Sequence, residues 1–71
     1  MGSSSFQGAV NNGSDISNLT SYSRGQYWVV ATSGVYVGQT CEAGDMIFCI
    51  NDYSSSFSNS DFNVVQNNLD L

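Results

Sequence analysis

The pattern of apolar and polar positions becomes strand-like after Gly25. Residues 26–32 read QYWVVAT, which is rich in the β-branched and aromatic residues that strands prefer. Ser33 and Gly34 interrupt this run, and residues 35–37 resume it as VYV. We therefore predict two strands joined by a tight turn at residues 32–34, which together would make a β-hairpin.

Two further apolar runs follow. Residues 46–51 read MIFCIN, a nearly continuous apolar run that is typical of a strand covered on both faces. Residues 61–66 read DFNVVQ and predict a fourth strand. Because residues 27–30 and 46–50 are apolar on both sides, we expect one face of the sheet to pack internally and the other to meet a partner chain.

Before Gly25 the pattern is irregular. Residues 1–14 are dominated by Ser, Gly and Asn, and we predict for them an extended or flexible segment without regular structure. The side-chain oxygen of Ser14 or Asp15 could cap a helix, because it can accept a hydrogen bond from one of the first free N–H groups. Two apolar residues then follow three positions apart, so one or two helical turns are expected over residues 15–20.

These elements predict a mainly β fold, a small antiparallel sheet or partial barrel with a short N-terminal helical turn. Residues 15–71 would form a single small domain, since 71 residues leave no room for a second one. A core of this size rarely supplies more than about 3–5 kcal/mol. Apolar residues nonetheless make up 41% of the chain, so we expect copies of the chain to bury part of this surface between them.

The charge balance excludes several classes of function. The chain has one cation, Arg24, against six acidic residues, for a net charge of -5. Nucleic acid is therefore excluded as a partner, because neutralising phosphates needs several Lys or Arg. No membrane insertion is expected, since no apolar run approaches the ~18 residues of a span. Without His or Lys the usual general bases are missing, so we expect neither enzymatic activity nor a cofactor.

Four acidic residues lie close to the predicted strands, and two kinds of role are conceivable for them. Glu42, Asp45, Asp52 and Asp61 could offer oxygen ligands to calcium or a carboxylate pair for glycoside hydrolysis. However, the ligand spacing of an EF-hand loop is absent, and so small a domain has little room for a sugar-binding cleft. Turn chemistry is the favoured interpretation, and we expect no metal site.

Cys41 and Cys49 could form one disulfide if their strands are adjacent. Free cysteine is among the most buried residue types, and the sequence shows no secretion signal. We therefore expect two buried free thiols rather than a disulfide.

The loop at residues 52–60 carries two aromatic side chains, Tyr53 and Phe57. Both are candidates for contact with an external ligand, because aromatic rings can stack on sugars. Loop aromatics more commonly fold back over their own sheet, and this alternative is the favoured one. Trp28 lies within an apolar strand, so we expect it in the core or in a subunit interface.

Four motifs occur in a fixed order along most of the chain. They read GQYWVV at 25–30, GVYVG at 34–38, CEAGDMI at 41–47 and DFNVVQNNLD at 61–70. This order resembles a module of tailed-bacteriophage fibre proteins, both head fibres and tail fibres. The resemblance covers about residues 25–70, and its most specific parts are the C-E-x-G-D element and the V-x-Q-x-N-x-D ending.

The resemblance implies a non-enzymatic structural protein of the virion. Fibres of this kind are generally intertwined homotrimers, so the implied partners are two further copies and other virion proteins of the capsid or tail. The chain would trimerise and attach or present the fibre. The alternative is a carbohydrate-binding or adhesin module that contacts a glycan of the host surface, with Tyr53 and Phe57 as its contact residues.

Two groups of residues receive structural roles in this interpretation. Glu42, Gly44 and Asp45 would form a turn that fixes the register of the strands, with Gly44 able to take a positive φ. Alternation along the strands assigns six residues to core or intersubunit packing: Trp28, Val30, Ile47, Phe48, Phe62 and Val64. A register slip of one residue would exchange the two faces.

Overall fold

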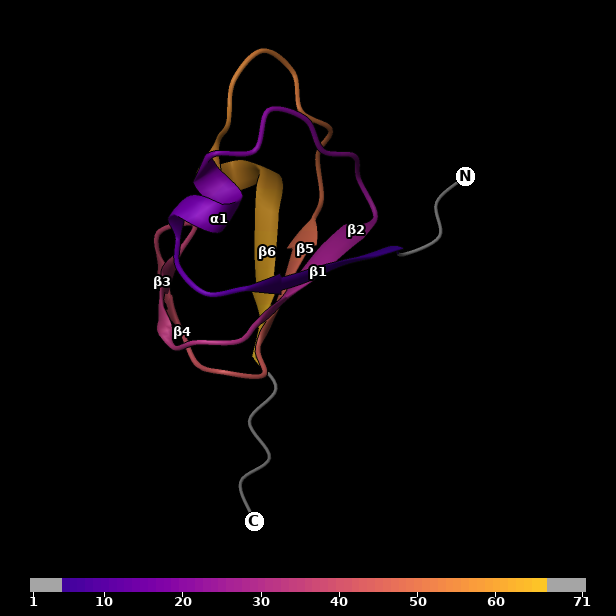
Figure 1. Ribbon diagram of the computed structural model, residues 1–71. Coiled ribbons are helices and arrows are strands. Elements are labelled where there is room, and N and C mark those ends of the chain that lie inside the picture. The colour runs from indigo at the N-terminus through magenta and orange to yellow at the C-terminus, as the bar shows by residue number, and fades with distance from the viewer. Residues whose placement is uncertain (1–4, 67–71) are drawn as a thin grey trace.

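In the computed structural model of the chain, residues 5–66 are described, and they form a four-stranded sheet and a separate two-stranded hairpin (Figure 1). The elements in chain order are β1 (Ser5–Val10), α1 (Ser14–Ser17), β2 (Gln26–Val30), β3 (Gly34–Tyr36), β4 (Gln39–Cys41), β5 (Met46–Cys49), the 3-10 turn η1 (Asn59–Asp61) and β6 (Phe62–Val65). The prediction of a mainly β domain with one short helical turn is confirmed. The end of the fourth motif, residues 67–70, lies outside the described residues.

The large sheet has the strand order β1-β2-β5-β6. β2 pairs antiparallel with β5, and β5 with β6, but β1 runs parallel to β2. The prediction of an antiparallel sheet is therefore wrong, because the sheet is mixed. β1 also gives residues 5–10 a regular structure, which the prediction of an extended or flexible segment over residues 1–14 did not include. The main-chain N–H and C=O groups of β2 can form hydrogen bonds with any extended segment. A Ser- and Gly-rich segment without apolar alternation can therefore still become a strand.

The predicted hairpin between residues 26–32 and 35–37 is also wrong. β3 pairs instead with β4, with Tyr36 opposite Gln39, so the turn consists of Val37 and Gly38. Both have positive φ, 44° and 79°, as the commonest two-residue hairpin turn requires. A β-branched residue rarely adopts this conformation, and Val37 is held in it while its side chain is buried in the core.

The helix α1 is shorter than predicted, and its N-cap is Gly13 rather than Ser14 or Asp15. A Cβ at Gly13 would lie 2.5 Å from the carbonyl oxygen of Val35, so the close approach of this turn to β3 admits only glycine. Asn12 supplies the nearby side-chain acceptor instead, since its Oδ1 accepts from the Ser14 N–H at 3.1 Å. The packing of α1 against the hairpin thus decides where the helix begins.

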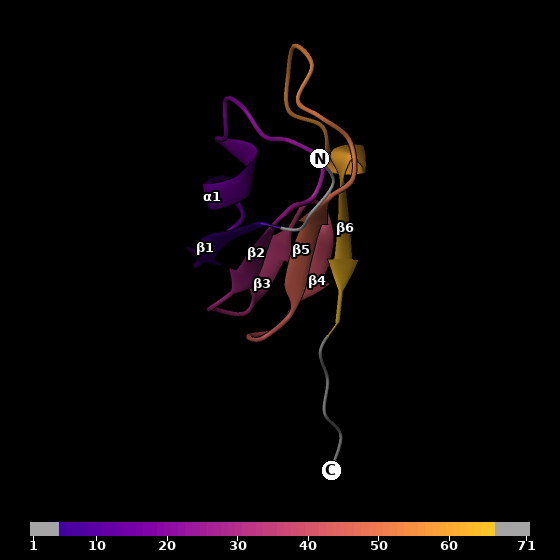
Figure 2. The ribbon, with the colours of Figure 1, turned by 90° about the vertical axis from the view of Figure 1, so that its right-hand side faces the viewer.

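The domain has two layers with the core between them. In Figure 2 the large sheet faces the viewer, and the β3–β4 hairpin lies behind it. The core combines buried side chains from the sheet, α1 and the hairpin: Val10, Ile16, Tyr22, Trp28, Val30, Tyr36, Val37, Cys41, Ile47, Cys49 and Phe62. The hydroxyl of Tyr36, which is fully buried, donates to the Thr32 carbonyl at 2.6 Å and ties the hairpin to the end of β2.

Candidate functional site

The strands of the large sheet alternate between two faces. Trp28 and Val30 of β2 are buried, as are Ile47 and Cys49 of β5 and Phe62 of β6. Their neighbours along each strand point to the opposite side, because successive side chains alternate. The sheet therefore has an inner face, which forms the core, and an outer face, which is turned away from the hairpin.

The outer face is formed by alternate residues of β2, β5 and β6 and by two residues of β1 that lie on either side of an irregularity in its register, and these residues pair in two rows. The first row is Phe6, Tyr27, Phe48 and Asn63, and the second is Ala9, Val29, Met46 and Val65. The ring centroids of Phe6 and Tyr27 are 5.5 Å apart, and those of Tyr27 and Phe48 are stacked at 5.0 Å. Three aromatic rings from three strands thus form a continuous row across the face.

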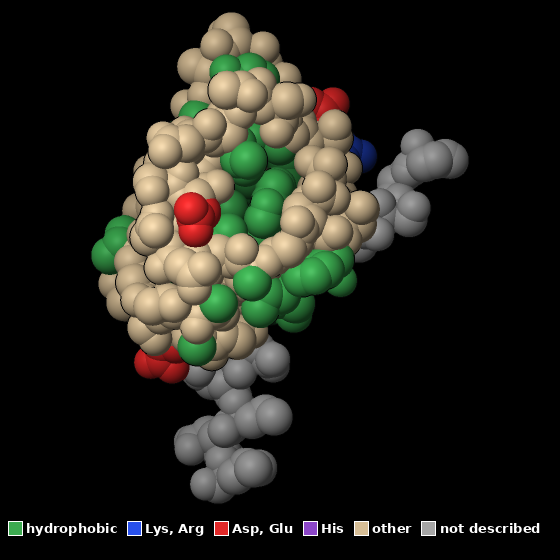
Figure 3. All heavy atoms as spheres, viewed as in Figure 1, with side chains coloured by type: hydrophobic (Ala, Val, Ile, Leu, Met, Phe, Trp, Pro, Cys, Tyr) green, Lys and Arg blue, Asp and Glu red, His purple; other side chains and the backbone are tan. Residues whose placement is uncertain are grey.

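The outer face is uncharged and remains partly accessible to solvent. The side chain of Phe6 is 56% exposed and that of Val65 39% exposed, and the apolar residues of the two central strands are half-buried. Figure 3 shows hydrophobic side chains along the lower right of the molecule, beside β1 and β2, with acidic side chains elsewhere. This face is the candidate interaction site.

The six residues predicted for packing divide between the two faces. Trp28, Val30, Ile47 and Phe62 are buried in the core, and the half-buried Val64 packs against it. Phe48 lies on the outer face and stacks on Tyr27, because it is one position out of step with Ile47. The six residues assigned to packing did not include the other residues of the outer face. The residues on either side of Trp28 in β2 point to the opposite face, and this alternation could have identified them from the sequence.

The predicted register turn forms between β4 and β5. The Asp45 N–H donates to the Glu42 carbonyl at 3.0 Å, and the Oδ2 atom of Asp45 accepts from the Glu42 N–H at 2.9 Å. Gly44 has a φ of +99°. Val30 accepts from the Gly44 N–H and donates to the Asp45 carbonyl, both at 2.8 Å. The turn therefore continues the β2–β5 ladder by two further hydrogen bonds.

Tyr53 and Phe57 fold back onto the domain. Their rings meet the ring of Tyr22 edge-on, with centroid distances of 5.1 and 6.5 Å, and both side chains are half-buried. The Tyr53 N–H also donates to the Tyr22 carbonyl at 2.9 Å. These contacts hold the loop against the core, although each ring keeps an exposed part.

Cys41 of β4 and Cys49 of β5 are buried free thiols. Burial raises the pKa of both thiols, so they are protonated at neutral pH. The thiol of Cys49 donates to the Asn51 carbonyl at 3.1 Å. Both therefore behave as small buried side chains rather than as reactive thiolates.

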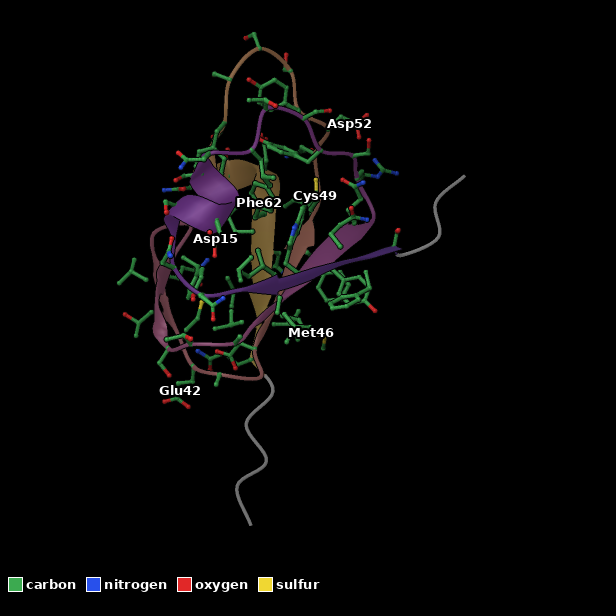
Figure 4. The ribbon with its side chains drawn as sticks, in the orientation of Figure 1. Asp15, Glu42, Met46, Cys49, Asp52 and Phe62 are labelled. Atoms are coloured by element: carbon green, nitrogen blue, oxygen red, sulfur yellow. The ribbon has the colours of Figure 1, made fainter. Side chains whose placement is uncertain are left out.

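The acidic side chains are dispersed rather than gathered. Figure 4 shows Asp15 on α1, Glu42 near the β3–β4 hairpin and Asp52 in the loop at the opposite end, all apart from Met46 on the outer face. Across residues 5–66, no three His, Cys, Asp or Glu side chains could jointly hold a metal ion, and no pocket is found. No helix in this part of the chain is long and apolar enough to cross a membrane.

Comparison with known proteins gives no relative for this chain. No model of a protein family matches it, and no curated protein or solved structure matches it significantly. The most distinctive feature of the described residues is the outer face.

Proposed function

We propose that the protein is a non-enzymatic structural component of a bacteriophage virion fibre, either a head fibre or a tail fibre. In this function the chain assembles as a homotrimer and attaches or presents the fibre, with capsid or tail proteins as further partners. The observation that carries the proposal is the uncharged apolar outer face. A contiguous exposed apolar patch on a small domain is typical of an interaction surface.

Two sequence features support the same function. The order of the four motifs resembles that of phage fibre modules. The C-E-x-G-D element of that resemblance falls on the turn between β4 and β5, where Asp45 and Gly44 bond to the backbone of Glu42 and Val30. The specific part of the motif thus has a structural role, as expected of a protein whose function is assembly.

We do not extend the proposal to glycan binding through Tyr53 and Phe57. Both rings pack against Tyr22, which accounts for two aromatic residues in a polar loop without a ligand.

The proposal is tested by the mass of the protein in solution. Light scattering should give three times the chain mass of 7.6 kDa, with little folded monomer on dilution. A stable monomer at micromolar concentration would contradict it. Mass spectrometry of purified virions should then detect the chain as a component, and the genes beside its own should distinguish a head fibre from a tail fibre.

A further inference from the structure

We infer that the outer face, formed by Phe6, Ala9, Tyr27, Val29, Met46, Phe48, Asn63 and Val65, is the surface through which copies of this chain bind one another. The inference rests on the proposed self-association and adds to it the surface that does the binding, together with the residues at its centre and edge.

The first argument is the contrast between the two faces of one sheet. The inner face is covered by the β3–β4 hairpin and α1, and its residues are almost fully buried. The outer face has a similar content of aromatic and aliphatic side chains, yet no described segment packs over it (Figure 2). A contiguous apolar patch of this kind on a small protein marks a binding surface.

The second argument is the residue composition of the outer face. The central parts of protein–protein interfaces are enriched in Tyr, Phe and Met and depleted of Lys, Glu and Asp. The outer face has two Phe, one Tyr and one Met, and no charged residue. Its polar groups, the Tyr27 hydroxyl and the Asn63 amide, both lie in the row of aromatic rings, where they can make directional bonds across an interface.

The third argument concerns the identity of the partner. The chain carries a net charge of -5 with a single cation, so two copies repel each other wherever their acidic surfaces meet. The charged residues among residues 5–66 all lie off the outer face: Asp15, Arg24, Glu42, Asp45, Asp52 and Asp61. Two copies that meet through this face therefore bring no like charges into direct opposition.

A partner of another kind fits less well. A basic protein would be drawn to the acidic parts of the surface, and an anionic partner such as a nucleic acid finds no cation on the outer face. An uncharged apolar face is complementary to other faces of the same kind, and in a closed homotrimer each copy can turn this face towards the threefold axis, where it meets the same face of the other two copies. The occupant that satisfies both the charge and the apolar chemistry is this same chain.

The test replaces residues of the outer face by aspartate in the full chain. Val29 lies on central strand β2, between Ala9 and Met46, and Phe6 lies on edge strand β1 and is 56% exposed. Val35→Asp is the matched control, because Val35 is also a strand residue and is 60% exposed, but it belongs to the hairpin on the other layer. Circular dichroism would establish that each variant is folded.

Sedimentation equilibrium over a wide dilution series would then measure self-association. A buried unpaired carboxylate opposes association strongly, so Val29→Asp and Phe6→Asp should each raise the dissociation constant at least about tenfold. Val35→Asp should associate as the unchanged chain does. If Val29→Asp does not fold, the dissociation constant of Phe6→Asp decides the test, because the Phe6 side chain is already about half exposed to solvent.

The possible outcomes test the inference about the outer face and the proposed trimer separately. If the unchanged chain is oligomeric and both outer-face variants keep its dissociation constant, the inference is overturned while the proposed trimer stands. If the unchanged chain is monomeric throughout, both are overturned. If the outer-face variants lose binding to a capsid protein or a host glycan with no change in self-association, the face serves another partner and the inference is again overturned.

Discussion

The phenol hydroxyl of Tyr22 donates a hydrogen bond to the Oδ2 atom of Asp61, across 39 positions of the chain. Tyr22 precedes β2, and Asp61 ends η1, the turn that leads into β6. The same hydroxyl accepts from the Ser58 N–H at 3.4 Å. Since β2 and β6 lie on opposite sides of β5 in the sheet, this buried tyrosine joins the segments that lead into two strands without a shared ladder.

We expect Tyr22→Phe to destabilise the domain by about 1 kcal/mol, because the half-buried carboxylate of Asp61 loses its phenol donor while the ring packing is kept. For a domain of this size that corresponds to a fall in Tm of roughly 4–8 °C, which thermal unfolding followed by circular dichroism would measure. Tyr53→Phe is the control, since the structure gives the Tyr53 hydroxyl no hydrogen bond within residues 5–66. An equal fall in both variants would contradict the assigned role of the Tyr22–Asp61 bond.

The same tyrosine should make the domain sensitive to alkali. Burial, with a further contribution from the bond to Asp61, raises the pKa of Tyr22 to about 12, above the value of about 10 in an unfolded chain. The folded state therefore retains this proton more strongly. The stabilising contribution is complete below about pH 10 and is lost as the pH rises towards 12.

Urea unfolding between pH 9 and 12 would measure this loss. Burial also raises the pKa of Tyr36, Cys41 and Cys49, so the domain as a whole should weaken as the pH rises through this range. Tyr22→Phe lacks one of these groups, so its free energy of unfolding should fall less steeply between pH 10 and 12. Parallel curves for the two proteins would show that folding does not change the pKa of Tyr22.

Whether an element could be predicted from the sequence depended on the kind of interaction that holds that element in place. β2, β5 and β6 were predicted because their apolar alternation is strong, although β5 ends at Cys49 and β6 at Val65. β1 was missed because it is held by its main-chain ladder to β2. The true hairpin turn was missed because Val37, which is buried in the folded domain, adopts a positive φ that its residue type disfavours.

The sequence predicted that the sheet has a second apolar face, but it did not identify the residues that form this face. The prediction came from apolar character on both sides of β2 and β5, and the structure shows this second apolar face, while the partner chain expected to cover it stays a prediction. The membership of each face depended on register, which a single position changes, so Phe48 was grouped with Ile47 although they lie on opposite faces. The contribution of β1 to the outer face, Phe6 and Ala9, required its pairing with β2 to be known.

The turn between β4 and β5 gives a further prediction. Gly44→Ala should destabilise the domain by about 1–3 kcal/mol, because a φ of +99° is strained for any residue with a Cβ. No atom lies within 4 Å of where that Cβ would be, so the loss would come from the backbone alone. Chemical denaturation would measure it.

Gly34→Ala provides the matched control for this turn. Its Cβ would meet the ring of Tyr36 at an ordinary contact distance of 3.7 Å, and its φ lies outside the left-handed region. We expect its free energy of unfolding to stay within about 0.5 kcal/mol of that of the unchanged chain. A similar loss in both variants would mean that Gly44 is not selected for its conformation.

The loop aromatics distinguish a structural role from a ligand-binding one. Tyr53→Ala and Phe57→Ala should each lower the free energy of unfolding by about 1–2 kcal/mol, because each removes a half-buried ring that packs edge-on against Tyr22. Ser55→Ala, at an exposed position of the same loop, should have no measurable effect. A glycan-binding role makes the opposite prediction for the two rings, unchanged thermal stability with loss of binding to a glycan array, and that result would reverse our assignment of this loop to the core.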